Sequence, residues 1–207
     1  MRLERGIGIL VMFVVLSAVG CTLEVHYPPG EIAPNSPIQE KVTSAQIHMV
    51  GKYAVRPVAR FQVEARVLST ERYRFDRGAT LSPVDLALGW GPMSDQTVLD
   101  QIDISQGGRF YRWRVKNYPI PRQQIIEHSA NMHMIPANDE VRNDLLAVRV
   151  GEVVHIEGYL VVATSEDGAI WKTSLTRKDS GDGACELVWV ENILSYSPDM
   201  AVSDFGF

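Results

Sequence analysis

The chain has 207 residues, a formal net charge of −5 and an apolar content of 45%. A chain of this length and composition can bury a core of ordinary size, so wholesale disorder is excluded. The mildly acidic balance gives no overall attraction to nucleic acid, and we expect no nucleic-acid partner.

The N-terminus has the pattern of an export signal. Arg2 and Arg5 precede an apolar run at 7–19, and small residues follow it before Cys21. The run is shorter than the roughly 20 residues that a helix needs to span a membrane. A positive start, a short apolar middle and small residues at the end predict a signal peptide at 1–20.

The four residues Ala18-Val19-Gly20-Cys21 resemble the lipobox of bacterial lipoproteins. In that family the signal is cut before the cysteine, and the thiol receives a diacylglycerol. The resemblance implies that Cys21 is lipidated, with palmitate among the acyl chains, and that the membrane is a partner through this lipid. The protein would then face the periplasm in the cell envelope, and Thr22 favours the outer membrane. A simple cleaved signal and an uncleaved anchor are the alternatives.

Prolines dominate the next segment, with Pro28-Pro29-Gly30 and Pro34-Asn35-Ser36-Pro37. Because proline blocks helices and central strands, we expect an extended tether over 21–41. A single globular domain is predicted over 42–194, and a loose polar tail over 195–207.

The first half of the domain carries alternating and capped patterns. Apolar and polar residues alternate over 61–67 and again over 109–116, which predicts two half-buried strands. Ser82-Pro83-Val84-Asp85 predicts a short helix ending near Gly89, because serine caps helices and proline suits their first turn. Ser94 or Asp95 is expected to cap a second short helix that runs to Gln101.

The second half opens with helical patterns and then becomes strand-rich. A helix is predicted over 121–129, and Asn138 is expected to cap another that turns Leu145 toward the core. Residues 154–162 read as a strand bent at Gly158.

The last part of the domain predicts paired strands. Asp167-Gly168 is a hairpin signal, and 170–177 and 185–193 read as a further strand pair around 179–183. Residues 150–158 resemble strands of small barrels such as the OB fold. The predicted fold class is α+β and β-rich: a mixed or barrel-like antiparallel sheet with a few short helices.

Polar side chains are densest where the 121–129 helix should end. We expect a loop there, in which Asn131 takes the left-handed conformation and returns His133 toward His128. With Cys185 and Glu186, these residue types allow two chemistries. Cys185 could be a nucleophile with His128 or His133 as its base and Asn131 orienting the imidazole. Alternatively, His128, His133 and Cys185 or Glu186 could hold zinc.

Both chemistries compete with structural interpretations. The loop could be pinned by its own side chains. Cys185 shares a strand face with Leu187 and Trp189, which favours a buried, unreactive thiol.

A second candidate surface combines Trp90 with Arg112 and Arg114. Trp90 stands in the turn Gly89-Trp90-Gly91-Pro92, and the arginines alternate with aromatic residues. They could bind an anionic ligand, or they could be a core tryptophan and the basic outer face of a strand.

The body resembles uncharacterised exported bacterial proteins over about 73–190. The motifs that carry this resemblance are 89–95, 131–137 and 183–186. It implies no activity. We therefore expect a lipid-anchored domain without a cofactor that binds or scaffolds an envelope protein, a glycan or a small ligand. The alternative is a lipid-anchored hydrolase or metalloenzyme that uses His128, Asn131, His133 and Cys185.

Overall fold

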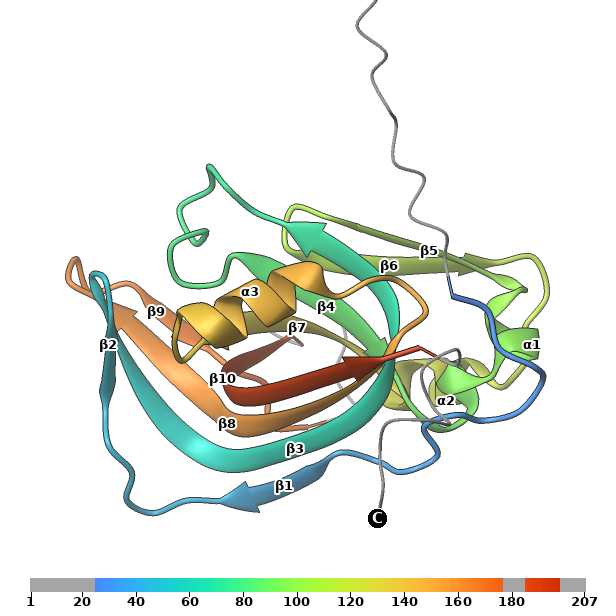
Figure 1. Ribbon diagram of the computed structural model, residues 1–207, viewed down its shortest axis with the longest axis horizontal. Helices are drawn as coiled ribbons and strands as arrows, with labels where there is room; N and C mark the ends of the chain where they lie inside the picture. Colours follow the sequence, from blue (N-terminus) through green and yellow to red (C-terminus); the bar gives the residue numbers. More distant parts are fainter. Residues whose placement is uncertain (1–24, 177–184, 198–207) are drawn as a thin grey trace, which may run out of the picture.

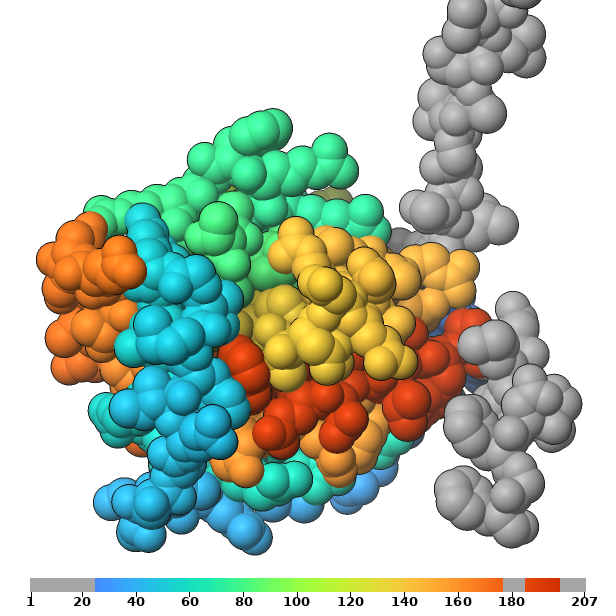
Figure 2. All heavy atoms as spheres, turned by 60° about the vertical axis from the view of Figure 1, so that its left-hand side comes forward, coloured from blue at the N-terminus to red at the C-terminus, as the bar shows by residue number. Residues whose placement is uncertain are grey.

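One long strand, β3 (Tyr53–Arg72), organises the fold, and Figure 1 shows it curving around the molecule. The computed structural model describes residues 25–176 and 185–197. β3 pairs antiparallel with four strands: β1 (Ile38–Lys41), β2 (His48–Val50), β4 (Val84–Gly89) and β8 (Val153–Ser165). Its long pairing with β8 brings the β2–β3 hairpin beside the end of β8 (Figures 1 and 2).

The large sheet closes on itself through hydrogen bonds. The ring runs β3–β4–β7–β10–β8 and returns to β3, where β7 is Ser129–Pro136 and β10 is Glu186–Tyr196. All these pairs are antiparallel except β7 with β10, which is parallel. A short strand, β9 (Ile170–Lys172), extends the sheet beyond β8. The predicted α+β, β-rich class with a mixed sheet is confirmed.

The interior of the ring is the main apolar core. Alternate side chains of its five strands point inward, and Val141 and Leu145 of α3 (Asp139–Ala147) join them. In Figure 2, α3 lies alongside β10. Because strand residues alternate between faces, Asp85 and Asn131 point outward while their neighbours on β4 and β7 fill the core.

A separate hairpin lies on the outer side of the ring. It consists of β5 (Ile102–Gly107) and β6 (Phe110–Val115). The hairpin packs with the 3-10 turn η1 (Gly91–Ser94), α1 (Gln96–Leu99) and α2 (Arg122–Glu127) around Ala87 and Met93. No helix among the described residues is both long and apolar enough to cross a membrane.

Several predicted local structures are confirmed. The Asp95 side chain accepts a hydrogen bond from the Thr97 amide at 2.8 Å and caps α1. Asn138 caps α3 in the same way through the Val141 amide at 2.9 Å. The strand over 109–116 is β6, and the helix over 121–129 is α2.

Two predicted local structures are wrong. The segment expected to be a helix from Ser82 is the strand β4, because Val84, Leu86 and Leu88 alternate into the core between β3 and β7. The loop expected after α2 is the strand β7, so Asn131 has extended rather than left-handed backbone.

The predicted tether is corrected from Val25 onward. The Val25 amide donates to the Val150 carbonyl at 3.3 Å, Ala33 is fully buried, and β1 pairs with β3. The prolines keep this segment extended, as expected, but it lies against the domain instead of standing clear of it. The signal peptide and Cys21 lie outside the described residues.

The C-terminal part differs in pairing from the prediction. β9 pairs with β8, while β10 pairs with β7 and β8, so among the described residues these two strands do not pair with each other. The two predicted segments meet only beyond β9, where the Ser174 amide donates to the Cys185 carbonyl at 3.1 Å. The predicted hairpin at Asp167-Gly168 is present, and Gly168 has the positive φ of 83° that such a turn favours. Strand β10 continues through Tyr196, past the expected start of a loose tail, whose residues 198–207 lie outside the described part. The 179–183 turn also lies outside it.

Candidate active site

A buried acid–histidine pair lies on the outer face of the ring. Asp85 on β4 stands opposite His133 on β7 in the antiparallel register. The Asp85 Oδ2 atom is 2.9 Å from the His133 Nδ1 atom, and the two side chains are 0% and 4% exposed. The pairing of neighbouring strands thus brings together Asp85 and His133, which are 48 positions apart in the chain.

A cysteine and an asparagine lie beside this pair. The parallel register places Glu186 opposite Met132, so Cys185 comes next to Asn131. The Asn131 Nδ2 atom donates to the Cys185 Sγ atom at 3.6 Å. Asn131 is held in turn by Gln106, whose Nε2 atom donates to its Oδ1 atom at 2.6 Å. Asn131 is buried, and Cys185 is half-buried and unbridged.

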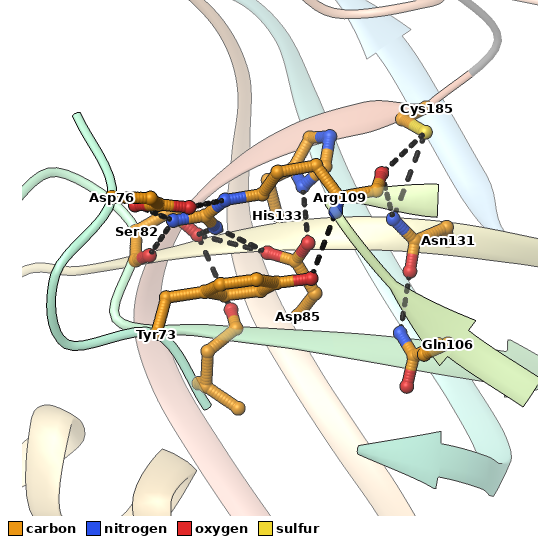
Figure 3. Close-up of polar contacts among 10 residues, drawn as sticks. Tyr73, Asp76, Ser82, Asp85, Gln106, Arg109, Asn131, His133 and Cys185 are labelled. Atoms are coloured by element: carbon orange, nitrogen blue, oxygen red, sulfur yellow. Dashed lines mark hydrogen bonds and ion pairs between the residues drawn. The ribbon is translucent and has the colours of Figure 1, made fainter. Parts of the chain in front are cut away.

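Arg109, at the tip of the β5–β6 hairpin, covers the pair. Its Nη1 atom lies 2.7 Å from Asp85 Oδ1, and its Nε atom lies 2.7 Å from Asp76 Oδ2. Its carbonyl oxygen accepts from Asn131 Nδ2 at 3.2 Å and lies 3.9 Å from Cys185 Sγ. Figure 3 shows these side chains gathered around the ion pair.

Arg109 has an unusual backbone conformation, which indicates that its surroundings hold it in place. With φ at 71°, it is the one described residue other than glycine in the left-handed region. Such a conformation costs on the order of 1–3 kcal/mol unless its surroundings hold it. Here the two carboxylates and the Tyr73 ring, whose centroid lies 3.6 Å from the guanidinium carbon, hold the side chain.

The network sets the protonation of His133. Burial disfavours the charged ring, but the Asp85 carboxylate and then Cys185 outweigh it and raise the pKa of His133 to about 9. At neutral pH the ring is therefore an imidazolium beside the Asp85 carboxylate. Arg109 acts on Asp76 as well, since its hydrogen bond lowers the pKa of that carboxyl.

Trp171 on β9 closes one side of the site. Its ring centroid lies 4.7 Å from that of His133. Trp171 and Arg109 also line a cavity of 360 Å³ together with Tyr53 and Ile170. The cavity therefore adjoins the site through Arg109 and Trp171, while His133 and Cys185 do not line it.

The structure brings together three of the predicted site residues, Asn131, His133 and Cys185. His128 is elsewhere: it packs against Gly91, where an added Cβ would lie 2.8 Å from the His128 Cδ2 atom. Glu186 is 1% exposed and follows Cys185 on a strand, so it points to the opposite, inner face. These two residues are corrections to the predicted polar site.

The sequence analysis does not predict that Asp85 and Arg109 belong to this site. The carboxylate of Asp85 between Val84 and Leu86 does indicate a buried partner, because a charge inside an apolar alternating strand needs one. For Arg109, the preceding Gly107-Gly108 marks a tight turn, but nothing local indicates where its side chain reaches.

The residues of the second predicted surface, Trp90, Arg112 and Arg114, do not lie together. Trp90 is 1% exposed and belongs to the core of the ring, so it offers no stacking surface. Arg112 and Arg114 are exposed on β6, as expected for the outer face of a strand.

Within the described residues, no three or more histidine, cysteine or acidic side chains are placed to hold a metal ion. Of the predicted zinc ligands, His128 packs at Gly91 and Glu186 points to the inner face, so these two are not part of the cluster around His133. No family model, curated protein or solved structure matches this chain.

Proposed function

We propose that this protein is a cysteine-dependent hydrolase of acyl bonds, with Cys185 as nucleophile. The observation that carries the proposal is that Asp85, His133 and Cys185 belong to one cluster. The Asp85 carboxylate lies 2.9 Å from the His133 ring, and the Cys185 sulfur lies 3.6 Å from Asn131, which shares the outer face of β7 with His133. A nucleophile, a histidine and an orienting acid in that order make up the arrangement used for acyl transfer on many unrelated folds.

The proposed reaction requires Cys185 to attack as a thiolate while His133 is an imidazolium. The sulfur attacks the carbonyl carbon of an ester, thioester or amide and forms a C–S bond. His133 donates its proton to the leaving group as the bond to that group breaks, which leaves an acyl-cysteine. Neutral His133 then takes a proton from water, the hydroxide attacks the acyl carbon, and the C–S bond breaks to restore thiolate and imidazolium.

Two neighbours have supporting roles in this scheme. Asp85 stabilises the imidazolium and orients its ring. Asn131 Nδ2 is a donor next to the sulfur, and its orientation is fixed by Gln106, so it is suited to stabilise the oxyanion that forms during attack.

The test uses p-nitrophenyl acetate and the chain from residue 22, which retains every described element and, of the two cysteines, only Cys185. We expect acetylation of Cys185, seen by mass spectrometry, with release of p-nitrophenolate. His133→Gln should slow this acylation about 100-fold, in line with the usual contribution of general acid–base catalysis. His155→Gln, on β8, is the matched control and should react like the wild type.

One outcome contradicts the proposal: a folded His133→Gln variant that is acetylated at the wild-type rate. Circular dichroism of each variant separates this result from unfolding. Such an outcome would favour the non-catalytic binding or scaffold role that the sequence also allows.

The cellular setting is also a proposal, supported by the lipobox resemblance alone. We propose that Cys21 carries lipid and holds the domain on the periplasmic side of the cell envelope. In cells fed labelled palmitate, Cys21→Ala should abolish labelling and leave an unprocessed precursor, whereas Cys185→Ala should be labelled normally. Labelling that survives Cys21→Ala would refute the assignment.

A further inference from the structure

A basic hollow lies apart from the cysteine site, between the hairpin strand β6 and the helix α2. Its volume is 680 Å³, and its lining includes Tyr111, Arg112, Trp113, Arg114 and Arg122. Four consecutive strand residues line this hollow, although neighbours on a strand point to opposite faces. Its lining also includes Ser105 of β5, the partner of Arg112, so the hollow takes in residues of both hairpin strands as well as of α2.

The three arginines of this hollow have their charges available. Among the described residues, none of them forms an ion pair with a carboxylate. Arg112 makes one hydrogen bond, from its Nη1 atom to the Gly107 carbonyl at 3.3 Å. Asp103 stands opposite Arg114 across the hairpin but is exposed and does not line the hollow.

Aromatic surface accompanies these charges. The Arg122 guanidinium carbon lies 6.0 Å from the Trp113 ring centroid, and Trp113 and Tyr111 are half-buried. Tyr111 is anchored through its hydroxyl, which donates to Ser129 Oγ at 3.3 Å. A hollow lined by three arginines and two aromatic residues suits an anion that carries a planar or apolar group.

We propose that this hollow binds a phosphate ester, with Arg112, Arg114 and Arg122 on the phosphate and Trp113 against the adjoining organic group. Guanidinium groups bind phosphate oxygens in pairs of parallel hydrogen bonds, so several arginines around one hollow favour phosphate over a neutral ligand. The same chemistry could come from a soluble phosphate ester or from the headgroup of an anionic phospholipid. This proposal does not depend on catalysis by Cys185.

Calorimetric titration with phenyl phosphate tests the site on the chain from residue 22. We expect saturable binding that weakens as salt is added. Arg114→Gln and Arg122→Gln should each weaken the affinity at least about tenfold, since each removes a charge-assisted contact. Arg74→Gln, an exposed arginine outside the hollow, is the matched control and should bind like the wild type. Cys185→Ala should also bind normally, which separates this proposal from the hydrolase.

The source of the phosphate is distinguished with vesicles of pure phosphatidylcholine or of phosphatidylcholine with phosphatidylglycerol. Arginine-dependent binding to the anionic vesicles, displaced by phenyl phosphate, identifies a lipid headgroup. Binding of phenyl phosphate without vesicle binding identifies a soluble ester. No saturable binding of phenyl phosphate, or equal binding by the wild type and both arginine variants, overturns the proposal.

Discussion

His133 is a residue whose charge the fold sets through one neighbour. Its ring is almost fully buried, yet Asp85 keeps it protonated at neutral pH. Burying an ion pair carries a desolvation penalty that often cancels the attraction between the charges. A pair of this kind is therefore weak support for stability alone, and its position next to a cysteine gives it a chemical interpretation.

The raised pKa of His133 predicts how stability depends on pH. Its value in the folded state, about 9, exceeds the unfolded value of 6.5, so its contribution is complete below pH 6.5 and is lost as pH rises through about 9. The full shift corresponds to roughly 3 kcal/mol. Urea unfolding between pH 6 and 10 should show this loss in the wild type.

Two variants check the assignment. His133→Gln and Asp85→Asn should both lose this part of the pH dependence, because one removes the titrating ring and the other removes the carboxylate that raises its pKa. A His133→Gln variant with an unchanged slope between pH 6.5 and 9 would show that another group is responsible.

At the residue scale, the sequence shows which side chains are reactive or polar better than it shows which of them contact one another. Asn131, His133 and Cys185 could be selected because their side chains are reactive or polar. Asp85 could not be assigned to His133, because their contact depends on the register between two strands. Strand alternation also decides that Glu186 turns away from Cys185, which already follows from the predicted strand over 185–193.

At the scale of elements, local sequence signals predict the structure correctly where the backbone hydrogen bonds are made by nearby residues. Asn138 and Asp95 cap helices as predicted, because a cap needs partners only two or three residues away. The serine, proline and aspartate before Leu86 carry an equally good helix signal, yet the segment is β4. There the burial of three alternating apolar side chains between β3 and β7 outweighs local preference.

The pairing of β8 with β10 depends on the absence of a side chain at Gly158. A Cβ atom there would lie 1.9 Å from the Trp189 carbonyl oxygen, where β10 has a register shift between Val190 and Asn192. Gly158→Ala must push the two backbones apart and should lower the free energy of unfolding by about 3 kcal/mol or more.

Gly107→Ala is the matched control for this change. Nothing lies within 4 Å of a Cβ atom at Gly107, so its unfolding free energy should change by less than about 1 kcal/mol. Equal stabilities of the two variants in urea would contradict the close approach between β8 and β10.

At the scale of the whole molecule, a buried arginine joins the N-terminal segment to the ring. Arg66 on β3 is 1% exposed, and it donates to the Val25 carbonyl at 3.2 Å and the Ser94 carbonyl at 3.3 Å. The sequence did not predict this, because Arg66 lies in an alternating strand and a proline-rich segment usually indicates a spacer.

Arg66→Met should release this segment. We expect a loss of about 3 kcal/mol in unfolding free energy, since the buried carbonyls lose charged donors, and faster proteolysis near Val25. Arg60→Met is the control: Arg60 is exposed and donates to the Tyr159 hydroxyl, so it should cost less than about 1 kcal/mol. Unchanged proteolysis of Arg66→Met would contradict the role of Arg66.

The chain already packs against the domain at Val25, close to the N-terminus, and this limits the distance between the domain and a bilayer. A fully extended chain spans at most about 3.6 Å per residue, so the four steps from Cys21 to Val25 reach about 14 Å. If Cys21 carries lipid, this short linker between Cys21 and Val25 holds the domain at the height of the headgroups and restricts its tilt. The molecules within its reach would then be those of the membrane surface itself rather than of the open periplasm.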